Sequence, residues 1–247
     1  MSTVPAAVEP PLSEGARVIN TFVAPSKTFT DIRRNASWWV PWLLISIAAL
    51  AFSVVVGKRV GFDQVVQNEI QKSSRYEQFQ NLPPEQRERQ MQLSMKITRT
   101  VAYAPPVTTL IAFIIVAAVL LAVFNFGAGA EVTFKQALAI TFYASLPFII
   151  YYALGIVSLM IGVDPEGFNI RNPVATNLAA WAGMDPARNK FAYGLASGLD
   201  VFAIWCIVLT GIGYSSISKL KRSTAIVIVA IAYVVYKVIG SALGSLG

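Results

Sequence analysis

Long runs of apolar residues alternate with polar connections along this chain. A helix needs about 20 mostly apolar residues to cross roughly 30 Å of hydrocarbon. Five stretches meet this condition, and each predicts a transmembrane helix: about residues 38–57, 106–126, 136–163, 195–216 and 224–243. They must be helical because lipid offers no partners to unpaired backbone groups. The third is long enough to tilt, or to bend at Pro147.

The segment before the first predicted span has an amphipathic pattern. Residues 1–11 are rich in proline and predict a flexible tail. Apolar residues then recur at helical spacing on either side of a break at Pro25: Leu12, Ala16, Ile19 and Val23 before it, Phe29 and Ile32 after it. This pattern predicts two amphipathic helices on the membrane surface. The alternative is a short solvated helix that packs on nothing.

Two polar connections are long enough to fold outside the membrane. Residues 62–100 have a rough apolar stripe and then a proline pair before Glu85, which is typical of a helix start. We expect a helical hairpin whose second arm runs towards the second span. Residues 164–194 contain Asn172 followed by Pro173, which predicts the start of a short helix with Trp181 on its apolar side.

Composition supports the membrane class. Apolar residues make up 55% of the chain and charged residues 13%, and the mean hydropathy is +0.57. A soluble domain rarely has this composition. The net charge is +7, but the basic residues lie beside span ends or among acids, so we expect no nucleic-acid partner. The sequence predicts an all-α, polytopic integral membrane protein.

Orientation follows from the positive-inside rule. Basic residues near the span ends are divided almost evenly between the two sides. The connector with Lys219, Lys221 and Arg222 is short enough for the rule to act, whereas the long insertion can translocate whatever its charge. We therefore expect a cytoplasmic N-terminus. The insertion, residues 164–194 and the C-terminus are expected on the opposite side.

Residue types exclude several chemistries. The chain has no histidine, which excludes serine–histidine proteolysis, HExxH zinc sites and imidazole haem ligation. No phosphate-binding GxxxxGK[ST] loop and no GxGxxG motif after a strand is present. We expect no catalysis, no cofactor and no metal site.

One acid, Asp200, falls inside a predicted span, and one lysine, Lys237, falls inside the next. Counted from the connector between the two spans, they differ in depth by only about 3 Å. We predict an ion pair between them, because a lone charge in hydrocarbon is costly. The alternative is that each side chain reaches its own interface. Gly211 and Gly213 favour close helix contact, and Trp205 is interpreted as core filling.

Four stretches resemble the Yip family, the Ypt- or Rab-interacting membrane proteins, in its bacterial members. They are FVAPSKTFTDIRRNASWWVPWLL, VTFKQALAITFYASLP, NPVATNLAAW and SGLDVFAIWCIVLTGIGYSSISKLKRSTAIVIVAIAYVVY. The positions similar to the family pattern are Pro25, Phe29, Trp38, Pro41, Pro147, Asn172, Pro173, Asn177, Asp200, Trp205, Gly211 and Gly213. The resemblance implies one membrane domain over residues 12–243, with five helices, in a bacterial cytoplasmic (inner) membrane.

The functional expectation is a non-enzymatic protein that organises the bilayer or scaffolds other membrane proteins. The resemblance implies a small GTPase as a weaker partner. The alternative is a small-solute transporter or permease subunit, whose polar path would use Asp200, Lys237, Asn125 and the tyrosines Tyr143, Tyr151 and Tyr152. A receptor for an external ligand bound by residues 62–100 also remains open.

Overall fold

The computed structural model describes residues 10–73, 75–162, 164–186 and 188–246. Most of the predicted tail, residues 1–9, lies outside the described residues. The described part has no β-strand, and one isolated bridge joins Asn177 to Asp200. Its helices are α1 (Glu14–Val23), α2 (Pro25–Ile32), α3 (Trp39–Arg59), α4 (Phe62–Gln71), α5 (Tyr76–Gln80), α6 (Pro84–Ala102), α7 (Pro105–Ala122), the π-helical turn η1 (Val123–Gly127), α8 (Phe134–Ala144), α9 (Pro147–Ile161), α10 (Leu178–Trp181), α11 (Lys190–Gly198), α12 (Val201–Ile217) and α13 (Arg222–Leu246).

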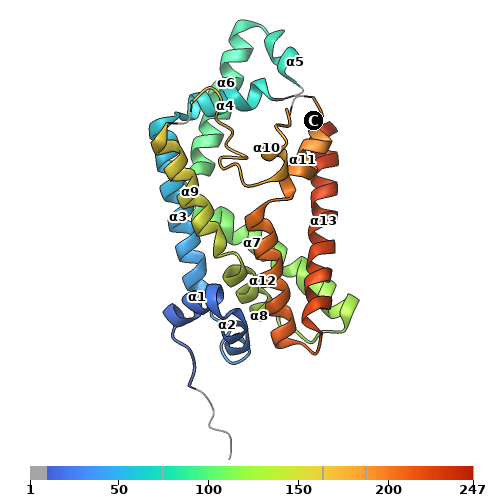
Figure 1. Ribbon diagram of the computed structural model, residues 1–247. Helices are drawn as coiled ribbons and strands as arrows, with labels where there is room; N and C mark the ends of the chain where they lie inside the picture. Colours follow the sequence, from blue (N-terminus) through green and yellow to red (C-terminus); the bar gives the residue numbers. More distant parts are fainter. Residues whose placement is uncertain (1–9, 74, 163, 187, 247) are drawn as a thin grey trace, which may run out of the picture.

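The apolar helices form an elongated bundle (Figure 1). Helices α1 and α2 lie at one end, which we call the N-terminal end, and α4, α5, α10, α11 and the C-terminus lie at the opposite end. Within the described residues, four helical segments are long and apolar enough to cross a membrane: Trp39–Arg59, Pro105–Gly127, Phe134–Ile161 and Arg222–Ser245. Many of their large apolar side chains face outward, as expected in lipid. The prediction of an all-α polytopic membrane protein is confirmed.

The third predicted span is broken at Pro147, where the sequence predicts a bend. Helix α8 ends at Ala144, and α9 begins with Pro147 in its first turn. Proline lacks a backbone N–H and clashes with the preceding turn, so one straight helix cannot pass through it. A capping box between Thr133 and Gln136 fixes the start of α8.

The prediction of one continuous fourth span over residues 195–216 is wrong. The chain leaves the helical conformation at Leu199 and Asp200, and α12 begins only at Val201. The Asp200 carboxylate accepts hydrogen bonds from the backbone N–H groups of Phe202 and Ala203. Aspartate favours this N-cap position, which ends one helix and starts another. The remaining 17 residues of α12 extend about 25 Å, the lower limit for a span.

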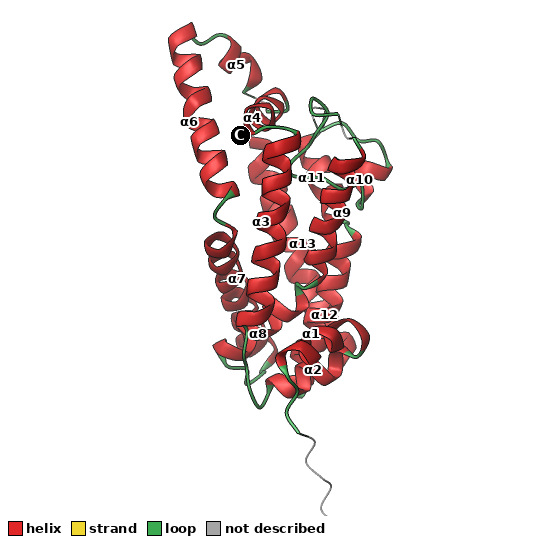
Figure 2. Cartoon of the chain, turned by 90° about the vertical axis from the view of Figure 1, so that its left-hand side faces the viewer, coloured by secondary structure: helices red, strands yellow, loops and turns green. Residues whose placement is uncertain are grey.

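Both polar connections contain helices, as predicted, but one of the helices begins at a different residue than predicted. Helices α4, α5 and α6 form the insertion, and α6 leads into α7 through a break before Pro105 (Figure 2). In the shorter connection, the helix does not begin at Pro173. It begins at Leu178, because Asn177 rather than Asn172 caps its first turn.

The core lies where α8 passes through the bundle. Its residues from Ala137 to Ala144 are all buried. The Phe142 ring stacks on Trp38, with centroids 5.5 Å apart, and Phe124 stacks on Tyr214 at 3.8 Å. Helix α2 docks on this core. It contacts α12 and α8, and its Phe29 and Ile32 side chains are fully buried. The predicted helix pair is therefore present, but its second member is part of the bundle.

Candidate functional site

Helix α1 buries two polar residues against the bundle and exposes two of its large apolar residues, while Val18 and Phe22 pack partly against the core. Arg17 is 1% exposed and Thr21 is fully buried, whereas Ile19 and Val23 are 65% and 73% exposed. A surface helix of a soluble protein has the opposite arrangement. Because α1 lies at the end of a membrane bundle (Figure 1), its exposed apolar side is suited to contact lipid.

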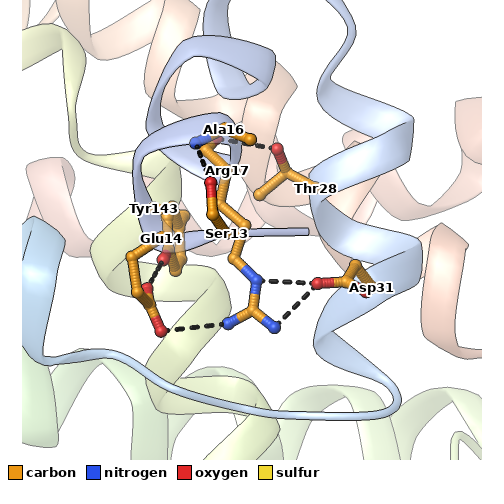
Figure 3. A network of polar contacts seen from close by, with 7 residues as sticks. All are labelled: Ser13, Glu14, Ala16, Arg17, Thr28, Asp31 and Tyr143. Carbon is orange, nitrogen blue, oxygen red and sulfur yellow. Dashed lines mark hydrogen bonds and ion pairs between the residues drawn. The ribbon is translucent and has the colours of Figure 1, made fainter. Parts of the chain in front are cut away.

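A network of charged and polar side chains holds α1 in this orientation (Figure 3). The Arg17 guanidinium approaches the Asp31 carboxylate of α2 through Nε and Nη2, each 2.7 Å from Oδ2. Its Nη1 lies 3.4 Å from Glu14 Oε1. The Tyr143 hydroxyl donates to Glu14 Oε2 at 2.6 Å. These contacts connect α1 to α2 and to the buried helix α8.

Backbone contacts strengthen the connection between α1 and α2. The hydroxyl of Thr28 in α2 donates to the backbone oxygen of Arg17 in α1 at 2.8 Å, and the hydroxyl of Thr21, within α1, donates to the same oxygen at 2.8 Å. Ser13 caps α1 by accepting a hydrogen bond from the backbone N–H of Ala16. Together, the polar contacts around Arg17 hold α1 in a single position relative to α2.

The network also keeps Arg17 charged. Burial alone would lower the pKa of Arg17, but the hydrogen bond and charge of Asp31, with the charge of Glu14, raise that pKa above its ordinary value. The guanidinium is thus protonated throughout the physiological pH range. A buried charge of this kind is strongly destabilising once its partner is removed.

This network is not among the sites predicted from the sequence. The apolar stripe of α1 predicted a surface helix, and no role was predicted for its polar stripe of Glu14, Arg17 and Thr21, which has equally good helical spacing. That stripe was the available signal. Its partner Asp31 lies on another helix, so the pairing depends on the turn at Pro25.

At the opposite end, a second cluster gathers around Asp200. The Thr176 hydroxyl donates to Asp200 Oδ2. The backbone N–H of Leu178 donates to the Leu199 oxygen, and that of Val201 donates to the Thr176 oxygen, both at 3.1 Å. The loop after α9 is thereby fastened to the break between α11 and α12.

Two asparagines extend this cluster. Asn177 is buried, accepts a hydrogen bond from the backbone N–H of Ala180, and donates through Nδ2 to Asn172 Oδ1 at 2.6 Å. Asn172 in turn donates to the Tyr193 hydroxyl of α11 at 3.3 Å. The fold thus brings Asn172, Asn177 and Asp200 together from separate parts of the sequence, with Pro173 in the connecting loop.

The predicted ion pair between Asp200 and Lys237 is not formed. It is absent from the salt bridges of the described residues, and the Asp200 carboxylate is engaged by Thr176 and the start of α12. The Lys237 stem instead packs against Gly198, where an added Cβ would overlap it. The prediction rested on the equal depth of the two residues along their helices, and depth does not determine which sides of two helices face each other.

The remaining predicted positions serve helix packing. A Cβ added to Gly211 would lie 2.6 Å from Ile226 Cα, and one added to Gly213 would lie 2.5 Å from Ile140 Cγ2. Trp205 packs edge-on against Phe22 of α1, with ring centroids 5.7 Å apart. Pro25 begins α2, and Pro41 is buried in the first turn of α3.

The residues of the predicted transport path are not gathered around one cavity. Asn125 holds the loop after η1 by exchanging two hydrogen bonds with the backbone of Val132. Tyr151 packs on Phe202, and Tyr152 on Phe52. In the described structure, Lys237 lines a cavity of about 800 Å³ at the end opposite α1, whereas the other path residues are not part of its lining.

Comparison with known proteins identifies the family. The family model described as Yip1 domain matches residues 19–243, from α1 to the last turns of α13. No curated protein and no solved structure gives a significant match. The matched range includes the bundle, the docked helix α2 and the cluster around Asp200. The chain therefore belongs to the Yip1 domain family of integral membrane proteins.

Proposed function

We propose that this protein organises the bilayer around it, with α1 as a wedge in the leaflet at the N-terminal end. The exposure of Ile19 and Val23 on a helix whose polar side is buried carries this proposal. Each apolar side chain removed from water contributes about 1.5–3 kcal/mol. An amphipathic helix embedded at the headgroup level expands one leaflet relative to the other.

A wedge must be held firmly to act on lipid. Helix α2 supplies the anchor, because Phe29 and Ile32 are buried in the core and Asp31 binds Arg17. Trp205 of α12 adds a contact to Phe22 of α1. Force on α1 would therefore be transmitted to the transmembrane helices rather than absorbed by a loose segment.

Charge favours placing this end at the cytoplasmic leaflet. Lys27 and Arg33 of the α2 region are exposed, as are Lys219, Lys221 and Arg222 of the connector between α12 and α13. The Arg222 side chain also donates to the Ser26 hydroxyl at 2.9 Å, which joins the two basic segments. Cytoplasmic leaflets carry anionic lipids that attract such residues. We propose a bacterial inner membrane, with the N-terminus cytoplasmic.

Other roles have less support. Scaffolding of other membrane proteins is compatible with the exposed bundle surface, but no feature selects a partner. A small GTPase, the partner class that the family resemblance implies, would meet an α1 whose polar side chains are turned inward. A solute path through Asp200 conflicts with the hydrogen bonds that already engage this carboxylate.

The test is a vesicle-remodelling assay with the purified full chain and the double substitution Ile19→Ser and Val23→Ser. Deleting residues 12–34 would be less informative, because it removes Phe29 and Ile32 from the core. The matched control is Leu93→Ser with Ile97→Ser, two similarly exposed residues of α6. We expect the α1 variant to lose most vesicle narrowing and the control to retain it. Unchanged remodelling by the α1 variant would refute the wedge.

A further inference from the structure

The cavity at the end opposite α1 has an excess of positive charge. It lies between α11, the last turns of α13 and the loops that follow α4 and α9, with a volume of about 800 Å³. Its lining carries five cations and one carboxylate: Lys72, Arg75, Arg171, Lys190 and Lys237, against Glu69.

Part of this charge is already neutralised within the protein. Arg171 Nε lies 2.6 Å from Glu69 Oε2, which accounts for the single acid. Lys72 donates to the backbone oxygen of Phe168 at 3.3 Å. In the part of the chain that the structure describes, the side chains of Arg75, Lys190 and Lys237 have neither a hydrogen bond nor an ion pair. The cavity lining therefore presents four cations without an ion-pair partner, and three of them, Arg75, Lys190 and Lys237, also have no hydrogen-bond partner among the described residues.

Lys237 is the most informative of the three because it belongs to a membrane-spanning segment, Arg222–Ser245. A cation at this position is costly unless an anion accompanies it. The Asp200 carboxylate lies close enough for its charge to act on Lys237, but it forms no ion pair with Lys237 and is hydrogen-bonded by Thr176 and the start of α12. An anion from outside the chain would give Lys237 a direct partner and offset the excess positive charge of the cavity lining.

The residues around Lys237 leave room for such a ligand. Gly194 and Ser197 of α11 and Gly240, Ser241 and Gly244 of α13 line the cavity. Nothing lies within 4 Å of a Cβ added to Gly240 or Gly244. Small residues at a helix crossing usually bring the helices together, but at these two positions they border open space.

We propose that this cavity binds the phosphate of an anionic phospholipid head group, with Lys237, Lys190 and Arg75 as its counter-charges. Free phosphate shares this chemistry, but α13 favours a lipid. Its Tyr236 lines the cavity and is 67% exposed, and Val235 and Ile239 are exposed on the same helix. The acyl chains would lie along this apolar surface. The proposal does not depend on the wedge, which lies at the other end of the bundle.

The experiment measures lipid binding to the detergent-purified full chain by native mass spectrometry. Three ligands are compared at matched concentrations: phosphatidylglycerol, phosphatidylcholine and sodium phosphate. The main variant is Lys190→Gln with Lys237→Gln. A second, Arg75→Gln with Lys190→Gln, spares the packed Lys237 stem and so separates binding from folding. The control is Arg89→Gln with Lys96→Gln, two exposed cations of α6 that do not line the cavity.

We expect the native chain to prefer phosphatidylglycerol. Each lost charge should weaken this binding about fivefold, so each double variant should bind about 25-fold more weakly. The control should stay within about twofold of the native chain. Equal binding by the variants, or equal binding of phosphatidylcholine, would overturn the proposal. Sodium phosphate that binds as well as the lipid, or displaces it, would show a soluble-phosphate site and overturn the lipid assignment.

Discussion

The Arg17 guanidinium and the Asp31 carboxylate meet inside the crossing of α1 and α2, with Nε and Nη2 each 2.7 Å from Oδ2. Both side chains are buried. This pair keeps the polar side of α1 against the bundle, where Val18 and Phe22 also pack on the core, and Ile19 and Val23 face outward. A buried ion pair thus contributes to the orientation of a surface helix together with its partly buried apolar residues.

Asp31→Asn should destabilise the protein by about 3–5 kcal/mol, because it leaves Arg17 buried without its main counter-charge. Replacing both residues, Arg17→Met with Asp31→Leu, should cost less than this single change, since no uncompensated charge remains. Denaturant titration in mild detergent measures both. Glu77→Gln, at an exposed position of α5, is the control. A loss for Asp31→Asn no larger than the control's would contradict the role given to this pair.

Tyr143→Phe should cost about 1.5–3 kcal/mol, the usual range for a hydrogen bond to a charged group. The lost hydroxyl donates to Glu14 at 2.6 Å and is the link between α8 and α1. Tyr76→Phe, at an exposed position of α5, removes the same atom without this contact. The same titration should separate the two variants. Equal stability would mean that the Tyr143 hydroxyl does not hold α1.

The sequence was sufficient for the elements that depend on local physics. Runs of apolar residues predicted α3, α7, α9 and α13, and prolines predicted the breaks at Pro25 and Pro147. It did not predict the break at Asp200, because the apolar run continues on both sides of it. At that break Asp200 caps α12, and its other carboxylate oxygen accepts from Thr176, 24 residues earlier. The Arg17 network and the position of Lys237 likewise depend on which helix faces meet, and a single sequence does not record that.

Gly211→Ala should destabilise the bundle by about 1–3 kcal/mol, the cost of overpacking a fitted contact. The added Cβ would meet the backbone of Ile226 at 2.6 Å, and a backbone atom cannot move aside as a flexible side chain can. Gly15→Ala is the matched control, because nothing lies within 4 Å of its added Cβ. The control should be neutral or slightly stabilising. Thermal unfolding of the two variants in detergent measures the difference, and equal midpoints would contradict the close contact of α12 and α13.

Asp200 should couple more strongly to Thr176 than to Lys237. In a double-mutant cycle, Asp200→Ala with Thr176→Ala should show an interaction energy of about 0.5–3 kcal/mol, because the two side chains are hydrogen-bonded. Asp200→Asn with Lys237→Gln should show a smaller coupling, of about 0.5 kcal/mol or less, since the Asp200 charge acts on Lys237 but no direct ion pair joins them. A larger coupling in the second cycle would restore the ion pair that the sequence predicted.

The depth of α1 in lipid tests the central claim most directly. Cys206 is the single cysteine of the chain, so a Cys206→Ser background allows nitroxide labels to be placed one at a time through Ile19→Cys, Val23→Cys and Lys27→Cys. In lipid nanodiscs, electron paramagnetic resonance compares collision of each label with oxygen, which concentrates in lipid, and with a water-soluble nickel chelate. We predict that oxygen dominates at positions 19 and 23 and the chelate at position 27. Labels at 19 and 23 that are as accessible to the chelate as the label at 27 would contradict the account.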